Sequence, residues 1–412
     1  MVIVAESVWE TWREREANER KPAIALLLAT SAPPETALKA LAQATSEVMQ
    51  PRLAKAEAAG PGEEEFRTGY CSFARVPQGV LLRIDEGPDD FAGLLQGIAQ
   101  GLQARGLDGE FNLYVPEGVP EIPEQVDLFE CHLRVRGERV RRAKGGYDWK
   151  PDPEALANAA EAGIAWCRGN DPHLPLSLVV SLLPPVVLGA KDDVRGYLRE
   201  AIEGTSMVGG GVVQLTSAAP DRFRTFALTA WTGRVGLIEG GAAAKEDWQS
   251  SVRHLTKAMG ASAPWTVYGF LKRGSLRVGA VLGMSLPSDW LDIPHMNALV
   301  QEREAFEDRL VPDAFGAQLL SAGHREHIPD GPDWRVEALA SGRFLVEHVA
   351  PAAWFDGSLV RFGGHPNPYY NPFPPTPTVL ARAREDFDPI LYKDGRPPAH
   401  ANELGDRRFL KP

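Results

Sequence analysis

The run AIALLLA at residues 23–29 marks where the first structural unit of this chain begins. It is short and continuously apolar, and Thr30-Ser31 and Pro33-Pro34 follow it, so it predicts a strand that is buried on both faces. The run LSLVVSLL at residues 176–183 repeats this pattern and is again followed by a proline pair, Pro184-Pro185. We therefore predict that each run opens one copy of the same unit.

The first copy predicts the order strand, helix, strand, strand, helix, strand. Helical spacing of apolar residues follows the first run until Pro51, and a hairpin with a Pro-Gly reversal is expected at residues 66–84. Asp89 or Asp90 then caps a second helix, and residues 111–115 close the unit as a strand. The apolar stripe of that second helix consists of Phe91, Leu94, Leu95, Ile98 and Leu102.

The second copy predicts the same order between residues 176 and 272. A helix with Val194 and Leu198 on its apolar face precedes strands within residues 212–238, and a second helix leads to a strand at 265–270. Because the order strand, helix, strand, strand, helix, strand occurs twice along the chain, we predict an α+β fold with two tandem ferredoxin-like (βαββαβ) units.

The domain boundaries are predicted from changes in composition. Residues 139–146 are basic and end in two glycines, which is typical of a linker, of an edge strand protected by cations, or of a nucleic-acid stripe. We favour the edge strand or linker because the whole chain is acidic. The predicted domains are 1–145 (first ferredoxin-like domain), 146–274 (second ferredoxin-like domain) and 275–412 (a C-terminal α+β region with a Pro-rich loop and extended tail).

Charge restricts the partners. The 412 residues include 44 Lys plus Arg and 55 Asp plus Glu, which gives a formal charge of −11. That balance argues against nucleic-acid and anionic-membrane binding and favours cationic partners, although an acidic surface also simply aids solubility.

The N-terminal residues, the absence of a long apolar stretch and the cysteines predict the cellular compartment of the protein. The first residues have no basic leader, and the sequence has no uninterrupted apolar stretch of membrane-spanning length, so we expect a cytoplasmic protein. Cys71, Cys131 and Cys167 are odd in number and far apart, which predicts reduced and mostly buried thiols.

Motifs with known chemistry are scarce. His324 and His327 have i, i+3 spacing, which could place two imidazoles on a metal, but solvated histidines are the simpler interpretation. Gly209-Gly210-Gly211 precedes a predicted strand and indicates a turn, and no phosphate-loop, dinucleotide or nucleophile-elbow motif occurs. We therefore predict no catalytic residue, no metal and no cofactor.

Three acidic pairs could support acid–base chemistry, but their positions favour another role. Asp85-Glu86, Asp89-Asp90 and Asp192-Asp193 all fall in predicted turns or helix starts. Carboxylates there accept backbone N–H groups and complement the helix dipole, so capping is the favoured interpretation.

Aromatic residues around the Pro-rich stretch give the one positive indication of binding. Rings beside rigid backbone make good contact anchors, although they could equally hold the loop on its own domain. The predicted partner-binding residues are Trp354, Phe355, Tyr369, Tyr370 and Phe373.

The last hundred residues or so resemble the ending of bacterial polymorphic-toxin immunity proteins, including the type VI immunity group. The resemblance is carried by the runs FGAQLL (315–320), WRV (334–336), GRFLV (342–346) and LARAREDFDPIL (380–391). It implies a cytoplasmic, non-catalytic protein that neutralises a cognate toxin by occluding the toxin's site.

We therefore expect a protein-binding protein, most simply an immunity protein with a toxin as its partner. Two alternatives stay open: an enzyme with a cleft between the tandem units, and a phage or bacterial assembly protein. Binding to copies of itself is compatible with each of these.

Overall fold

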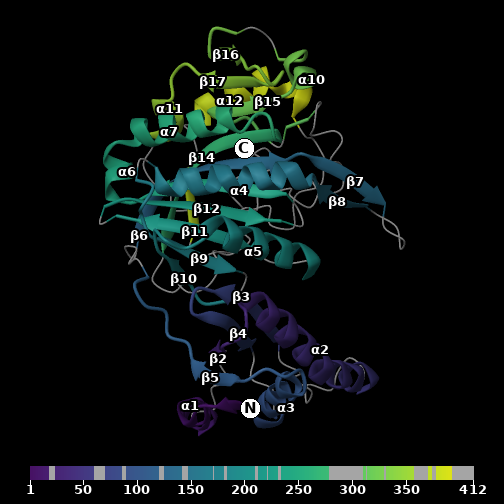
Figure 1. The fold of residues 1–412 in the computed structure, drawn as a ribbon. Helices are drawn as coiled ribbons and strands as arrows, with labels where there is room; N and C mark the ends of the chain where they lie inside the picture. Colours follow the sequence, from purple (N-terminus) through teal and green to yellow (C-terminus); the bar gives the residue numbers. More distant parts are fainter. Residues whose placement is uncertain are drawn as a thin grey trace. The chain divides into compact units, whose positions relative to one another are not determined.

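A computed structural model describes most of the chain. The described residues are 1–17, 24–59, 70–85, 90–119, 125–141, 147–169, 171–180, 183–208, 212–219, 221–230, 233–277, 310–311, 313–328, 331–356, 370–373 and 377–391. Figure 1 gives the arrangement of helices and strands. Contacts between residues group the chain into two units, Met1–Val119 with Val179–Asp193, and Pro120–Leu178 with Val194–Pro412. The fold class is α+β, as predicted.

The first unit contains the first predicted copy. Its sheet has the order β1-β5-β2-β4-β3. The neighbouring pairs β5–β2, β2–β4 and β4–β3 are antiparallel, and β1 runs parallel to β5. β1 and α1, which precede the predicted copy, had not been predicted. The elements are β1 (Val2–Val4), α1 (Glu6–Ala17), β2 (Ile24–Ala29), α2 (Pro34–Ala59), β3 (Tyr70–Val76), β4 (Gly79–Asp85), α3 (Phe91–Ala104) and β5 (Gly109–Leu113).

The core of the first unit follows the predicted apolar pattern. Every residue of the predicted stripe on α3 is buried, and Asp90 caps this helix by accepting a hydrogen bond from the Gly93 N–H. The prediction for Pro51 was wrong, because α2 continues through it to Ala59. A proline in a helix interior removes one backbone hydrogen bond, and packing of the apolar face against α3 compensates for that loss.

The second unit is built on a larger sheet. Among the described residues of this unit the sheet has the order β9-β11-β12-β13-β6-β14-β15-β17-β16, with β18 beside β14; β10 is grouped with the first unit. The elements up to residue 277 are β6 (Gln125–Val135), β7 (Gly137–Arg141), β8 (Tyr147–Pro151), α4 (Pro153–Arg168), β9 (Leu176–Val180), β10 (Val186–Leu188), α5 (Val194–Val208), β11 (Val213–Ala218), β12 (Phe223–Thr229), β13 (Arg234–Gly240), α6 (Ala242–Glu246), α7 (Trp248–Ala261) and β14 (Thr266–Arg277).

The position of β6 differs from the prediction. The sequence places it at the end of a first domain that closes near residue 145, but β6 pairs with β13 on one side and with β14 on the other. Its residues Leu128, Phe129, Cys131 and Leu133 are buried there. Burial of these apolar side chains favours a position inside the sheet, where both edges of β6 are paired.

The C-terminal region adds strands to the same sheet. The apolar pattern predicts strands at residues 316–320, 334–340 and 343–349, and strands are present there. Both β15 and β18 pair with β14. The apolar pattern also predicts a strand at 277–284 and a helix at 296–310, and both lie outside the described residues except for their end residues 277 and 310. The elements are β15 (Ala317–Leu320), α10 (Ala322–Arg325), β16 (Trp334–Ala338), β17 (Phe344–His348), α11 (Ala352–Phe355), β18 (Tyr370–Phe373) and α12 (Pro377–Asp386), followed by a 3-10 turn at Asp388–Ile390.

Two helices cover one face of the second sheet. The Cβ of a residue replacing Gly163 of α4 would lie 2.4 Å from the Phe226 ring, so that glycine lets α4 pack directly on β12. Ser251 of α7 bonds to Glu239 of β13. The register places Phe226 opposite Leu237, two residues before Glu239, so α4 and α7 lie on the same face. A polar site forms beneath them.

Candidate functional site

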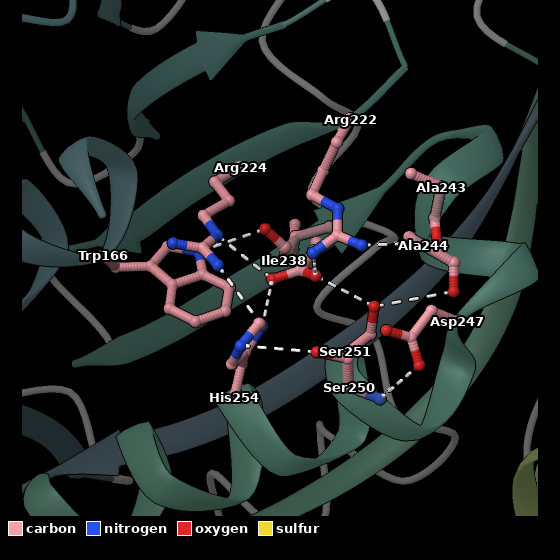
Figure 2. Close-up of polar contacts among 11 residues, drawn as sticks. Trp166, Arg222, Arg224, Ile238, Ala243, Ala244, Asp247, Ser250, Ser251 and His254 are labelled. Atoms are coloured by element: carbon pink, nitrogen blue, oxygen red, sulfur yellow. Dashed lines mark hydrogen bonds and ion pairs between the residues drawn. The ribbon is translucent and has the colours of Figure 1, made fainter. Parts of the chain in front are cut away.

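The site is centred on the carboxylate of Glu239, which is 0% exposed. Arg222 Nη1 lies 2.9 Å from Oε1 and Arg224 Nε lies 3.0 Å from Oε2. The Ser251 hydroxyl donates to Oε1 at 2.9 Å. Figure 2 shows the arginines, Ser251 and His254 converging from the sheet and from α7. Both carboxylate oxygens therefore have charged or hydroxyl donors from the chain itself.

Local structure explains why these groups meet. Residues directly opposite each other on paired strands share a face, and the register of β12 and β13 places Arg224 opposite Glu239. Arg222 lies just before β12, where its Nη2 also donates to the Ala243 carbonyl at 3.3 Å. Asp247 caps α7 by accepting from the Ser250 N–H at 3.1 Å, which fixes the first turn that carries Ser251.

Trp166 of α4 forms one wall of the site. Its indole Nε1–H donates to the Ile238 carbonyl at 3.0 Å, and the Arg224 guanidinium lies 4.8 Å from its ring centroid. A guanidinium above an indole face is stabilised by the ring quadrupole. Trp166 thus holds both the strand that carries Glu239 and the arginine that pairs with it (Figure 2).

The cross-strand pair of Arg224 and Glu239 continues as a row of opposite residues on two more strands, β6 and β14. Glu239 is opposite Phe129 of β6, and Phe129 is opposite Arg273 of β14. The Arg273 guanidinium lies 5.4 Å from the Phe129 ring centroid and 3.5 Å from Asp127 Oδ2. Lys245 Nζ lies at the same distance, 3.5 Å, from that oxygen. Charged groups under the helices are therefore paired along the row, as buried charges must be.

Ser250, His254 and Glu239 resemble the layout of a nucleophilic triad. His254 Nδ1 lies 3.4 Å from Glu239 Oε2, and Nε2 lies 3.5 Å from the Ser250 hydroxyl. However, Arg224 Nη2 is 3.3 Å from the same Nδ1, and a guanidinium can only donate. The tautomer of the ring decides whether Nδ1 donates to Glu239 or accepts from Arg224. Unlike the carboxylate of a nucleophilic triad, the Glu239 carboxylate also pairs with Arg222 and Arg224.

A second polar cluster lies on the opposite face of the sheet. His132 Nε2 is 2.9 Å from Glu130 Oε2, and Lys272 Nζ is 3.6 Å from that oxygen. The His132 ring stacks on Phe270 with centroids 4.9 Å apart. Burial lowers the pKa of His132, and the nearby Lys272 charge lowers it further, against an opposing effect of Glu130. His132 is therefore a neutral donor to Glu130.

The structure accounts for several residues that the sequence singled out. Trp354 and Phe355 are 5% and 2% exposed, so these two side chains belong to the core and are not surface anchors. The Trp354 ring lies 5.9 Å from the His348 ring and packs against Gly316. Tyr370 and Phe373 lie in β18, which pairs with β14, and Tyr369 lies outside the described residues.

The prediction of solvated histidines at 324 and 327 was wrong for one of them. His324 is 0% exposed, and its Nε2 is 2.9 Å from the Leu310 carbonyl oxygen. Its Nδ1 forms a hydrogen bond with the hydroxyl of Ser321, the N-cap residue of α10. The polar atoms of this buried ring are therefore hydrogen-bonded to protein groups and not to water. His327 is exposed. Within the described ranges, no group of three or more His, Cys, Asp or Glu side chains is arranged to hold a metal ion.

Two of the acidic residues, Asp90 and Asp192, behave as predicted, and two of the three cysteines are buried. Asp90 caps α3, and Asp192 accepts from the Gly189 N–H at 2.7 Å in a turn. The side chains of Asp85 and Asp89 and residue Glu86 lie outside the described part. None of the three cysteines forms a disulfide within the described residues; Cys131 and Cys167 are buried and Cys71 is partly exposed.

Sequence reasoning missed the Glu239 site altogether. The detectable signal was a charge within an otherwise apolar strand: Glu239 directly follows the apolar residues 235–238, and Arg224 directly precedes residues 225–228 on the neighbouring predicted strand. A charged residue of each sign on two adjacent apolar strands indicates a buried ion pair, but the pairing register is needed to bring them together.

Comparisons with known proteins identify no family. No protein-family model matches the chain, and no curated protein matches it. Among solved structures, the chain aligns with the crystal structure of ttk003000868 from Thermus thermophilus at 12% identity and a TM-score of 0.15. That alignment covers 69% of this chain and 43% of the other, so the chain spans less than half the length of that structure. A likeness of this size supports no argument about fold or function. Among the described helices, none combines the length and apolar character needed to cross a membrane.

Proposed function

We propose that this chain is a non-catalytic protein-binding protein of the bacterial cytoplasm that neutralises a cognate toxin by occluding the toxin's site. The observation that supports this most directly is the closure of the Glu239 site by its own neighbours. Arg222, Arg224 and Ser251 occupy both oxygens of the Glu239 carboxylate. The charges of this site hold elements together, which is what a rigid binding scaffold requires.

The charge balance supports a cationic partner. A formal charge of −11 produces a long-range field that accelerates encounter with a basic protein and repels nucleic acid. A scaffold that is already ordered loses little conformational entropy on binding, so a moderate interface suffices for tight association. Both properties suit a protein whose task is to reach a toxin quickly and to cover it.

The finer architecture is part of this proposal. In the first unit, the order β5-β2-β4-β3 with α2 and α3 as the connections supports a ferredoxin-like unit. In the second, the predicted elements occur along the chain, but the unpredicted β10 and α6 interrupt their order, and β6 lies between β13 and β14. We propose that the second unit is a ferredoxin-like unit opened by this added strand.

The proposal is tested by capture followed by titration. Tagged full-length protein is used to isolate partners from its source bacterium, and the partner is purified and assayed for its toxic activity. We expect that activity to fall linearly with added protein and to reach zero at a fixed stoichiometry. A partner that keeps full activity in the complex, or recovery of only the chain's own copies, contradicts toxin neutralisation.

An enzyme is the second candidate, and His132 is the observation that favours it. A buried imidazole with a perturbed pKa beside a carboxylate is a common feature of active sites. The two proposals differ in what a His132→Gln variant does. Neutralisation of the partner should survive this substitution if the fold is kept, whereas turnover of a substrate that depends on His132 should be lost.

A further inference from the structure

We draw no further inference here: the strongest candidate, the polar face of the second sheet around His132, Arg134 and Arg234, carries none, because these side chains are buried or half-buried and nothing in the described part of the structure shows what covers them.

Discussion

Arg224 and Glu239 lie directly opposite each other on β12 and β13, with Nε 3.0 Å from Oε2, beneath the indole of Trp166. Glu239 is 0% exposed and Arg224 has a side chain that is 21% exposed, so the pair joins a fully buried charge to one that reaches solvent. Such pairs add little net stability over an apolar replacement, but they are costly to break from one side. They also fix the register, because a slip of one residue would leave Glu239 unpaired.

Replacing Glu239 with Gln should destabilise the second unit strongly. Arg222 and Arg224 would both lose their carboxylate in a site that water enters poorly, and breaking a buried pair in this way costs about 3–5 kcal/mol. The free energy of unfolding in urea measures the effect. Glu161→Gln is the control, because its pair with Arg195 is solvent-exposed and such pairs contribute about 0–1 kcal/mol. Similar losses in the two variants would contradict this account of the site.

Gly163→Ala should weaken the packing of α4 on the sheet. A Cβ at this position would lie 2.4 Å from the Phe226 ring, and such overpacking typically costs about 1–3 kcal/mol. Gly204→Ala in α5 is the matched control, since no atom lies within 4 Å of its added Cβ. There we expect a gain of about 0.5–1 kcal/mol, the helix preference of Ala over Gly. Thermal or urea unfolding of the two variants should therefore shift in opposite directions.

The free energy of unfolding should depend on pH through His132. Burial lowers its pKa in the folded protein, while an unfolded histidine titrates near about 6.5. Between these two values only the unfolded chain binds the proton, so the stabilising contribution is complete above about pH 6.5 and is lost as the pH falls below it. The measurement is the urea midpoint of wild type and His132→Gln across this range. The variant should show a smaller decline, whereas His327→Gln, which leaves His132 intact, should follow the wild type.

The cysteines should differ sharply in reactivity. Burial raises the pKa of Cys167 to about 12 and also raises that of Cys131, so neither forms much thiolate near about pH 8. Cys71 is partly exposed. We expect a thiol reagent to modify one cysteine in the native protein and all three in denaturant, with Cys71→Ser removing the native reaction. Rapid native labelling of the Cys71→Ser variant would show that a buried thiol is accessible.

Hydrophobic periodicity was sufficient for several local elements of this chain. The α3 stripe from Phe91 to Leu102 is buried as predicted, and the apolar runs that open each copy form β2 and β9. Helix caps at Asp90 and Asp152 were also predictable, because a carboxylate before an apolar periodic run satisfies free backbone N–H groups. These features depend on residues close together in sequence, and their energetics are local.

The sequence by itself determined the α+β class, the element order from β2 to β5, the burial of two of the three cysteines and the acidic charge. Only the tertiary structure decided the place of β6, the burial of Trp354 and His324, and the assembly of the Glu239 site. Strand pairing is a contact between residues distant in sequence, and several registers satisfy the same apolar pattern until the buried charges are paired. The sequence does not indicate which residue pairs with a given charged residue. The desolvation cost that makes the two arginine partners of Glu239 necessary arises only when the folded core excludes water.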